Sequence, residues 1–251
     1  MTSVPLKLQF IGCGDAFGSG GRFNTCFHLT GERTNLLIDC GASSLIAMKQ
    51  LGIDRNAIET IVITHFHADH FGGIPFFMLD AQFVSKRNQP LTITGPPGLP
   101  EWYERVMETA FPGSAGANRI FEIELREIPA GGSTSLGDLR ISAYQALHGP
   151  PDGPCHAVRI DAEGRSVAYT GDGEWTNELI EAARGTDLFI AEAYFRDKAI
   201  QTHLSLSVIE EHLAQLQTRR LVLTHMSADM LGQLEQLDFE FADDGKIILI
   251  D

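Results

Sequence analysis

A six-residue segment directly after an apolar run contains three histidines and one aspartate: His65, His67, Asp69 and His70. Neutral imidazole and carboxylate groups are ligands that zinc and similar divalent ions accept. Because alternate residues of an extended segment share one side, His65 and His67 can bind the same ion. The chain then turns toward a glycine pair at 72–73, so Asp69 and His70 can reach a second ion. The spacing therefore predicts a metal site.

Three further candidates close apolar runs and open loops: His148, Asp172 and His225. Proteins of the α/β class gather site residues at such strand ends. Alone, each residue has an ordinary structural explanation, because an aspartate beside glycine favours a turn and a histidine can bind nearby backbone. Together with the first cluster, the three residues supply the ligands that this cluster lacks.

Short apolar runs outnumber helical patterns, and most of the runs end in Gly, Asp, His or Pro, which is typical of strands. The runs lie at 6–11, 25–29, 35–39, 60–64, 91–94, 121–128, 139–147, 156–160, 166–170, 188–191, 221–224 and 246–250. Helical patterns lie at 43–51, 74–85, 100–111, 177–184 and 207–217. Because helices alternate with strands, we expect an α/β fold of two packed mixed sheets with helices outside. No linker or repeat divides the chain, so we expect one domain over 1–251.

The composition is that of an acidic globular protein, with a net charge of −14 and 43% hydrophobic residues. This charge disfavours long nucleic acids and anionic membranes, since both need a basic surface. We therefore expect Arg22 and the pair Lys86-Arg87 to be solvated surface charges. The four cysteines form no CxxC pair, and neither a signal peptide nor a membrane-spanning run is visible. These features predict a reduced, cytoplasmic protein without a membrane segment.

The order of these motifs resembles that of the metallo-β-lactamase fold hydrolases: HxHxDH at 65–70, a lone histidine, a Gly-Asp after a Tyr-Thr strand and a late Thr-His. Six stretches are similar to the ribonuclease Z-like phosphodiesterase branch of that superfamily: Gly12-Cys-Gly14, Leu37-Ile-Asp39-Cys-Gly41, Pro90-Leu-Thr-Ile-Thr-Gly95-Pro96, Glu192-Ala-Tyr-Phe195, His203-Leu-Ser205 and Thr224-His225-Met-Ser227. The resemblance covers nearly the whole chain and implies a four-layer αββα sandwich.

The resemblance also implies a dinuclear metal centre. One zinc ion would be held by three histidines: His65, His67 and His148. The other would be held by Asp69, His70 and His225. Asp172 would bridge both ions together with a hydroxide. Zinc is the expected metal, with manganese and iron as alternatives.

Three carboxylate or imidazole groups beside these ligands receive roles from the same resemblance. Asp39 matches a buried aspartate that orients the first motif, because ligating histidines commonly donate their other N–H to a carboxylate. Without the resemblance, Asp39 also fits a turn before Cys40. Glu192 would orient His203, which would contact the phosphate or protonate the leaving oxygen. Asp69, Glu192 and His203 thus form the implied catalytic group. Otherwise Glu192 is a surface charge and His203 a helix cap.

The chain differs from the ribonucleases that it resembles in one feature that affects substrate size. Those enzymes carry a long arm between the lone histidine and the Gly-Asp motif, whereas His148 and Asp172 are only 24 residues apart. The missing arm and the net charge both disfavour transfer RNA. We therefore expect a metal-dependent phosphodiesterase for a small anionic ester, such as a cyclic nucleotide or a sugar phosphate. Homodimers are common in this branch, so a homodimer is an option.

Several alternatives stay open at this stage. An alkyl- or arylsulfatase of the same fold would use the same metals. A mononuclear lactonase or thioesterase is a further hydrolase alternative, disfavoured by the Glu192/His203 pair. A tRNA 3′-processing endonuclease, an iron oxidoreductase and a non-catalytic metal-binding module are less favoured.

Overall fold

The computed structural model describes residues 5–150 and 153–251. Residues 1–4 and 151–152 of the expected domain 1–251 lie outside the described residues. Within the described ranges, no helix has both the length and the apolar character needed to cross a bilayer.

Seven strands form the first sheet, in the order β13-β1-β2-β3-β4-β5-β6. They are β1 Leu6–Gly12, β2 Cys26–Thr30, β3 Asn35–Ile38, β4 Thr60–Val62, β5 Leu91–Gly95, β6 Ile123–Glu127 and β13 Ile247–Ile250. The strands from β13 through β1 and β2 to β3 pair antiparallel, whereas those from β3 to β6 run parallel. Parallel neighbours need crossover connections, and most of the helices of this half lie in them.

Six strands form the second sheet, in the order β12-β11-β10-β9-β8-β7. They are β7 Ser133–Leu136, β8 Leu139–Gln145, β9 His156–Ala162, β10 Arg165–Tyr169, β11 Leu188–Glu192 and β12 Leu221–Thr224. Antiparallel pairing runs from β7 to β10, and parallel pairing from β10 to β12. The prediction of two mixed sheets is confirmed. The sequence did not predict β7, because its residues are polar and lie at the sheet edge.

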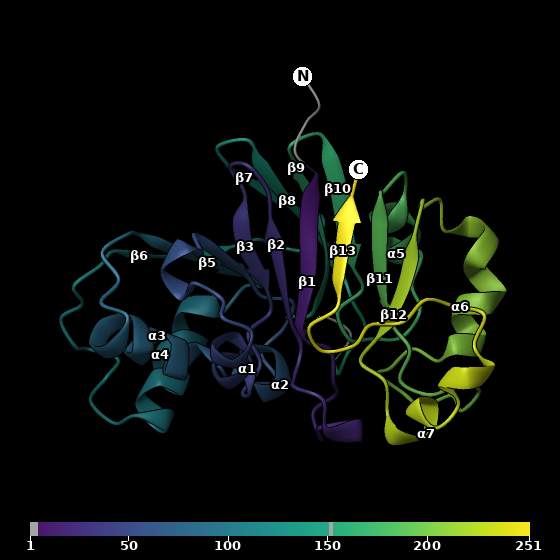
Figure 1. The fold of residues 1–251 in the computed structure, drawn as a ribbon, viewed down its shortest axis with the longest axis horizontal. Coiled ribbons are helices and arrows are strands. Elements are labelled where there is room, and N and C mark those ends of the chain that lie inside the picture. The colour runs from purple at the N-terminus through teal and green to yellow at the C-terminus, as the bar shows by residue number, and fades with distance from the viewer. Residues whose placement is uncertain (1–4, 151–152) are drawn as a thin grey trace.

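Helices cover the outer face of each sheet. They are α1 Ser44–Gln50, α2 Ala68–Phe71, α3 Ile74–Leu79, α4 Leu99–Ala110, α5 Glu178–Ala183, α6 Leu206–His212 and α7 Ala228–Leu231. Short 3-10 or π turns lie at Ser19–Gly21, Arg55–Ala57, Asp80–Val84, Leu213–Gln215 and Leu234–Gln236. Apolar side chains of α1, α3 and α4 pack on the first sheet, and those of α5 and α6 on the second. Figure 1 shows the first three helices beside the first sheet and the other two beside the second. The arrangement is the expected four-layer αββα sandwich.

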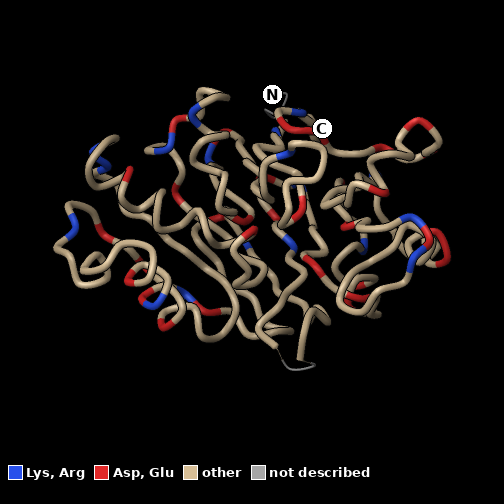
Figure 2. The backbone as a smooth tube through the Cα atoms, turned by 90° about the horizontal axis from the view of Figure 1, so that it is seen from below, with Lys and Arg blue, Asp and Glu red and all other residues tan. Residues whose placement is uncertain are grey.

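Charged residues are distributed around this sandwich. Figure 2 shows Lys and Arg positions of the described backbone scattered among Asp and Glu positions. The Lys and Arg positions are thus interspersed with acidic positions rather than gathered along one path. A long polyanion needs many closely spaced cations along its path, so this distribution disfavours it.

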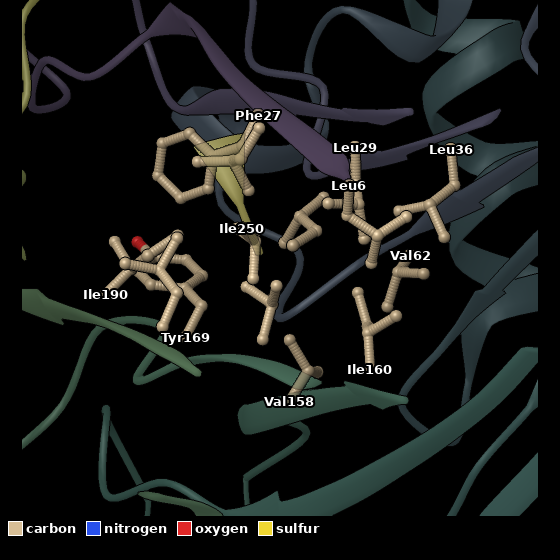
Figure 3. Close-up of a cluster of buried hydrophobic side chains, with 14 of the residues drawn as sticks. Leu6, Phe27, Leu29, Leu36, Val62, Val158, Ile160, Tyr169, Ile190 and Ile250 are labelled. Atoms are coloured by element: carbon tan, nitrogen blue, oxygen red, sulfur yellow. The ribbon is translucent and has the colours of Figure 1, made fainter. Parts of the chain in front are cut away.

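The inner faces of the two sheets meet in an apolar core. Figure 3 shows Phe27, Leu29 and Val62 of the first sheet on one side of this core, with Val158 and Ile160 of the second sheet on the other. Because strand side chains alternate between faces, each central strand contributes to this core and to the layer beneath the helices. The four cysteines are free and buried: Cys13, Cys26, Cys40 and Cys155.

Arg87 corrects one expectation from the sequence, because its side chain is fully buried rather than solvated. Its guanidinium donates hydrogen bonds of 2.6–3.3 Å to five backbone carbonyls, those of Arg55, Asn56, Ile58, Gln89 and Pro90. A guanidinium carries five N–H donors in a fixed fork, so it can pair all of these acceptors at once. Arg87 therefore joins the turn before β4 to the turn before β5.

Arg22 is also less solvated than expected. Its side chain is only 10% exposed, and its guanidinium donates to the carbonyl of Ala242 at 3.0 Å and lies 3.4 Å from Asp243. This arginine fixes the loop after β1 against the segment before β13. Both arginines thus stabilise connecting segments. The sequence pattern of strands and helices does not predict the positions of these segments.

Replacing Arg87 tests its structural role. Arg87→Met leaves five carbonyls without their donor, so we expect the free energy of unfolding to fall by about 3 kcal/mol or more in urea titrations. Arg105→Met is the control, because Arg105 is exposed and lies over the Trp102 ring; its cost is expected below about 1 kcal/mol. Equal losses for the two variants would contradict this role of Arg87.

Candidate metal centre

The first motif lies in a loop and a short helix that follow β4. His67 has an extended backbone and precedes α2, whereas Asp69 and His70 lie inside that helix. The loop approaches the segment after β3 so closely that side chains do not fit there. A Cβ atom on Gly41 would lie 2.1 Å from the Asp69 carbonyl oxygen, and one on Gly73 would lie 2.3 Å from that of Gly41. Glycine at these positions lets the two segments pack together.

The other predicted ligands follow strands of the second sheet. His148 lies three residues after β8, Asp172 follows β10 and His225 follows β12. Their strands end at the same edge of the sheet, as expected for site residues of α/β proteins. His225 has a φ of 53°, a left-handed backbone that costs a non-glycine residue of order 1–3 kcal/mol. Such strained positions cluster at functional sites, where the surrounding structure holds them.

Three imidazoles form the first ligand group. One ring nitrogen from each of His65, His67 and His148 lies within 4.8 Å of the others. His65 and His148 are buried, whereas His67 is exposed. Burial, and then the nearby His70, hold the pKa of His65 well below its usual value. A neutral imidazole of this kind is the form that binds a metal ion.

The second ligand group consists of four buried residues: Asp69, His70, Asp172 and His225. The Nε2 atoms of His70 and His225 lie 3.2–3.3 Å from Oδ2 of both aspartates. Asp172 Oδ2 also lies 4.0 Å from Nε2 of His148 in the first group. Asp172 is therefore the residue that lies between the two groups.

Electrostatics in the second group favour a cation. Burial opposes charge on Asp69, but the hydrogen bond from His225 and the adjacent His70 imidazole outweigh it and lower the pKa of the carboxyl. Burial opposes a proton on His225, but Asp172 and Asp69 outweigh it and raise its pKa to about 10. The carboxylates thus retain positive charge on the imidazoles. A divalent ion can replace those protons, since metal binding releases protons from its ligands.

Three ligand atoms show that the groups fit a metal ion. Within the described ranges, Nε2 of His65, Nε2 of His70 and Oδ1 of Asp172 are buried without a hydrogen-bond partner. Buried polar atoms are nearly always paired, so each of these atoms needs a partner. Nitrogen and oxygen donors in this proportion suit zinc, manganese or iron.

Asp39 holds the first motif in place. Its Oδ2 accepts hydrogen bonds from Nδ1 of His70 at 2.7 Å and from the Thr64 hydroxyl at 2.8 Å, and its Oδ1 accepts the Thr64 N–H at 2.8 Å. The Nδ1 bond turns Nε2 of His70 toward the ligand group. His148 is oriented similarly, because its Nδ1 donates to the carbonyl of Thr202 at 2.6 Å.

Glu192 and His203 form a pair beside the ligand groups. Nδ1 of His203 donates to Oε1 of Glu192, whose Oε2 accepts the N–H groups of Gly173 and Leu204 at 3.0 and 3.2 Å. Glu192 is fully buried, so it is not the surface charge that the sequence left open. Burial lowers the pKa of His203, but the hydrogen bond to Glu192 outweighs it, and the pKa is raised. The ring stacks on Tyr194, with centroids 4.6 Å apart.

The structure thus brings every site residue predicted from the sequence to one edge of the sandwich. Thr64, Tyr194 and Thr202 were not predicted, although each contacts a site imidazole. Tyr194 lies two residues after Glu192, a spacing that places both on one side of an extended segment. Thr202 acts through its carbonyl, which side-chain identity cannot reveal.

Known proteins share this fold. Ribonuclease Z of Methanothermobacter thermautotrophicus is 27% identical, and the alignment covers 88% of this chain and 87% of that protein. The crystal structure of the metallo-β-lactamase fold protein YhfI from Bacillus subtilis is 20% identical with a TM-score of 0.78, covering 98% of this chain and 99% of YhfI. A diphosphatase from the PhnP family is 20% identical with a TM-score of 0.77, covering 97% of both chains.

The resemblance to the ribonuclease Z-like branch of the metallo-β-lactamase fold is therefore confirmed. A more specific match comes from one family model, which covers nearly the whole described chain. This model, described as anti-Pycsar protein Apyc1, matches residues 6–248, and the chain belongs to that family.

Proposed function

We propose that the protein is a metal-dependent phosphodiesterase with a dinuclear centre. The observation that carries this proposal is the position of Asp172 between two ligand groups, with the Glu192–His203 pair beside them. His65, His67 and His148 would hold one ion, and Asp69, His70 and His225 the other, with Asp172 shared. Two divalent ions supply a deprotonated water near neutral pH and stabilise the charge that develops on a phosphoryl group. Zinc is the proposed metal, with manganese and iron as alternatives.

His203 is proposed to protonate the leaving oxygen. Its Nδ1 is bound to Glu192, so only Nε2 is free to meet a substrate. The raised pKa of His203 favours the imidazolium, in which Nε2 carries a proton to give. The side chain is 19% exposed, so a substrate can reach the ring from solvent. Glu192 and the stacked Tyr194 ring keep this ring in one orientation.

A small phosphodiester is the proposed substrate. Between His148 and Asp172, the described residues form only the β9–β10 hairpin, which leaves no arm of the kind that clamps transfer RNA. The acidic surface adds a second argument against a long polyanion. Cyclic nucleotides and sugar phosphates are the candidate substrates. A diphosphatase has the same fold, so phosphate chemistry is compatible with this architecture.

Metal content tests the dinuclear site. Elemental analysis of the zinc-loaded protein should find about two ions per chain, because the two ligand groups share one carboxylate. Asp172→Ala should lose most of both ions, whereas His212→Ala should keep them, since His212 stacks on Trp175 away from the ligand groups. One ion in the wild-type protein, or two in Asp172→Ala, would contradict this assignment.

Turnover of bis(p-nitrophenyl) phosphate tests the reaction class. We expect hydrolysis with zinc or manganese, and activity at the background level in the double variant His67→Ala/Asp69→Ala, because it lacks one ligand of each ion. Sulfate esters, lactones and thioesters serve as comparison substrates. If one of these is cleaved while the phosphodiester is not, the proposed reaction class is wrong.

Leaving groups of different basicity test the role of His203. A general acid contributes about 10²- to 10⁴-fold and matters most when the leaving oxygen is basic. His203→Ala should therefore lower kcat strongly for alkyl esters and little for p-nitrophenyl esters. Glu192→Gln should give the same pattern to a smaller degree. Equal losses on both substrate types would show that His203 only contacts the substrate.

A further inference from the structure

A polar pocket lies at the opposite end of the second sheet from the metal centre. Its volume is about 460 Å³, and it is lined around the turn between β9 and β10. Arg165 begins β10 and lines this pocket, whereas Asp172 follows the other end of the same strand. The two sites are therefore separated by roughly 20 Å along the strand, and a small ligand cannot occupy both.

Arginine is concentrated in this pocket. Of the nineteen Lys and Arg residues of this acidic chain, four line it: Arg140, Arg159, Arg165 and Arg219. They come from β8, β9, β10 and the segment before β12. Four carboxylates also line the pocket: Asp138, Asp161, Glu163 and Asp187. Whether the pocket attracts anions therefore depends on which arginines these carboxylates already neutralise.

Two of the carboxylates are paired with two of the arginines. Asp161 accepts from Nε and Nη2 of Arg159 at 3.1 and 3.0 Å. Asp187 accepts from Nη1 of Arg219 at 2.9 Å and also from the backbone N–H of Ser166 at 2.8 Å. Arg159 and Arg219 are thus neutralised within the pocket.

The other two carboxylates have partners outside the four arginines of the pocket. Asp138 forms an ion pair with Arg33, which belongs to the loop between β2 and β3. Glu163 accepts the backbone N–H groups of Glu32 and Arg33 at 3.0 and 2.9 Å. Both carboxylates therefore serve contacts with the first sheet and leave Arg140 and Arg165 without a counter-charge.

Arg140 and Arg165 have guanidinium N–H groups without an acceptor in the described structure. Among residues 5–150 and 153–251, no carboxylate oxygen lies within 4.0 Å of either guanidinium. Arg140 donates one bond, to the Ser133 hydroxyl at 3.2 Å, and Arg165 donates one, to the Gly164 carbonyl at 3.3 Å. Nε of Arg165 is buried without a partner in the described structure. A buried N–H of a charged group is costly to leave unpaired, so the protein alone does not satisfy the Arg165 guanidinium.

We propose that this pocket binds the phosphate group of a small molecule through Arg140 and Arg165. Guanidinium groups bind oxyanions through two parallel N–H bonds, and phosphate offers acceptor oxygens in several directions. Two arginines from different strands can therefore bind the same phosphate group. A planar carboxylate, in contrast, pairs in this way with only one guanidinium. The volume leaves room for a group attached to that phosphate. The site is independent of the reaction proposed for the metal centre.

Calorimetric titration with inorganic phosphate tests the pocket. Phosphate can also bind the metal centre, so the titration is run on the protein as isolated and again after treatment with a chelator. Binding in the pocket survives the chelator. The double variant Arg140→Gln/Arg165→Gln should weaken this surviving binding about tenfold or more. The charge-matched control Arg105→Gln/Arg126→Gln, on α4 and β6, should bind phosphate as the wild type does.

Thermal unfolding provides the second readout. Phosphate should raise the Tm of the chelated wild type and of the control but not that of Arg140→Gln/Arg165→Gln, because only bound ligand stabilises the folded state. If the glutamine variant does not fold, Arg140→Lys/Arg165→Lys replaces it, since lysine keeps the charge but loses the fork. The proposal is wrong if chelated wild type shows no binding at about 10 mM phosphate. It is also wrong if Arg140→Gln/Arg165→Gln and the control Arg105→Gln/Arg126→Gln bind phosphate with the same affinity. Binding of acetate as tight as that of phosphate would contradict it too.

Discussion

A buried carboxylate, Asp172, sets the constraint on which the site depends. It is 2% exposed and lies 3.3 Å from Nε2 of both His70 and His225. Removing a carboxylate from water costs several kcal/mol unless positive charge compensates for it. Within the described residues, its ion-pair partners are all imidazoles. The fold therefore retains this carboxylate only with protons or metal ions beside it, and the proposed hydrolysis would use the metal-bound state.

The sandwich meets this constraint by joining two sheets at one edge. The first sheet supplies Asp69 and His70 through α2, and the second supplies Asp172 and His225 at its strand ends. The inter-sheet core holds the two edges together, and the N–H of His156 donates to the Thr64 carbonyl at 2.9 Å across them. The left-handed backbones of Asp39 and His225 show that the fold holds strained residues at this edge. Asp39 uses that backbone while fixing the ring of His70.

Much of this site could be predicted from the sequence, because its residues lie at strand ends and are bunched within one short motif. HxHxDH at 65–70 and the later Asp172 and His225 needed only strand periodicity and ligand chemistry. Arg87 could not be placed in this way, since nothing in its sequence context shows that five carbonyls surround it. The polar edge strand β7 forms through pairing with β8, and its residues carry no apolar pattern. The arginine pocket also escapes prediction, because its residues come from distant segments that only the sheet brings together.

X-ray absorption spectroscopy of the zinc-loaded protein tests the central claim most directly. Two ions bound by imidazole and carboxylate groups around a shared Asp172 should give nitrogen and oxygen ligands and a metal–metal distance of about 3.5–4 Å. In Asp172→Ala that metal–metal signal should disappear. A spectrum of isolated zinc ions in the wild-type protein, or of zinc bound to sulfur, would contradict the dinuclear centre.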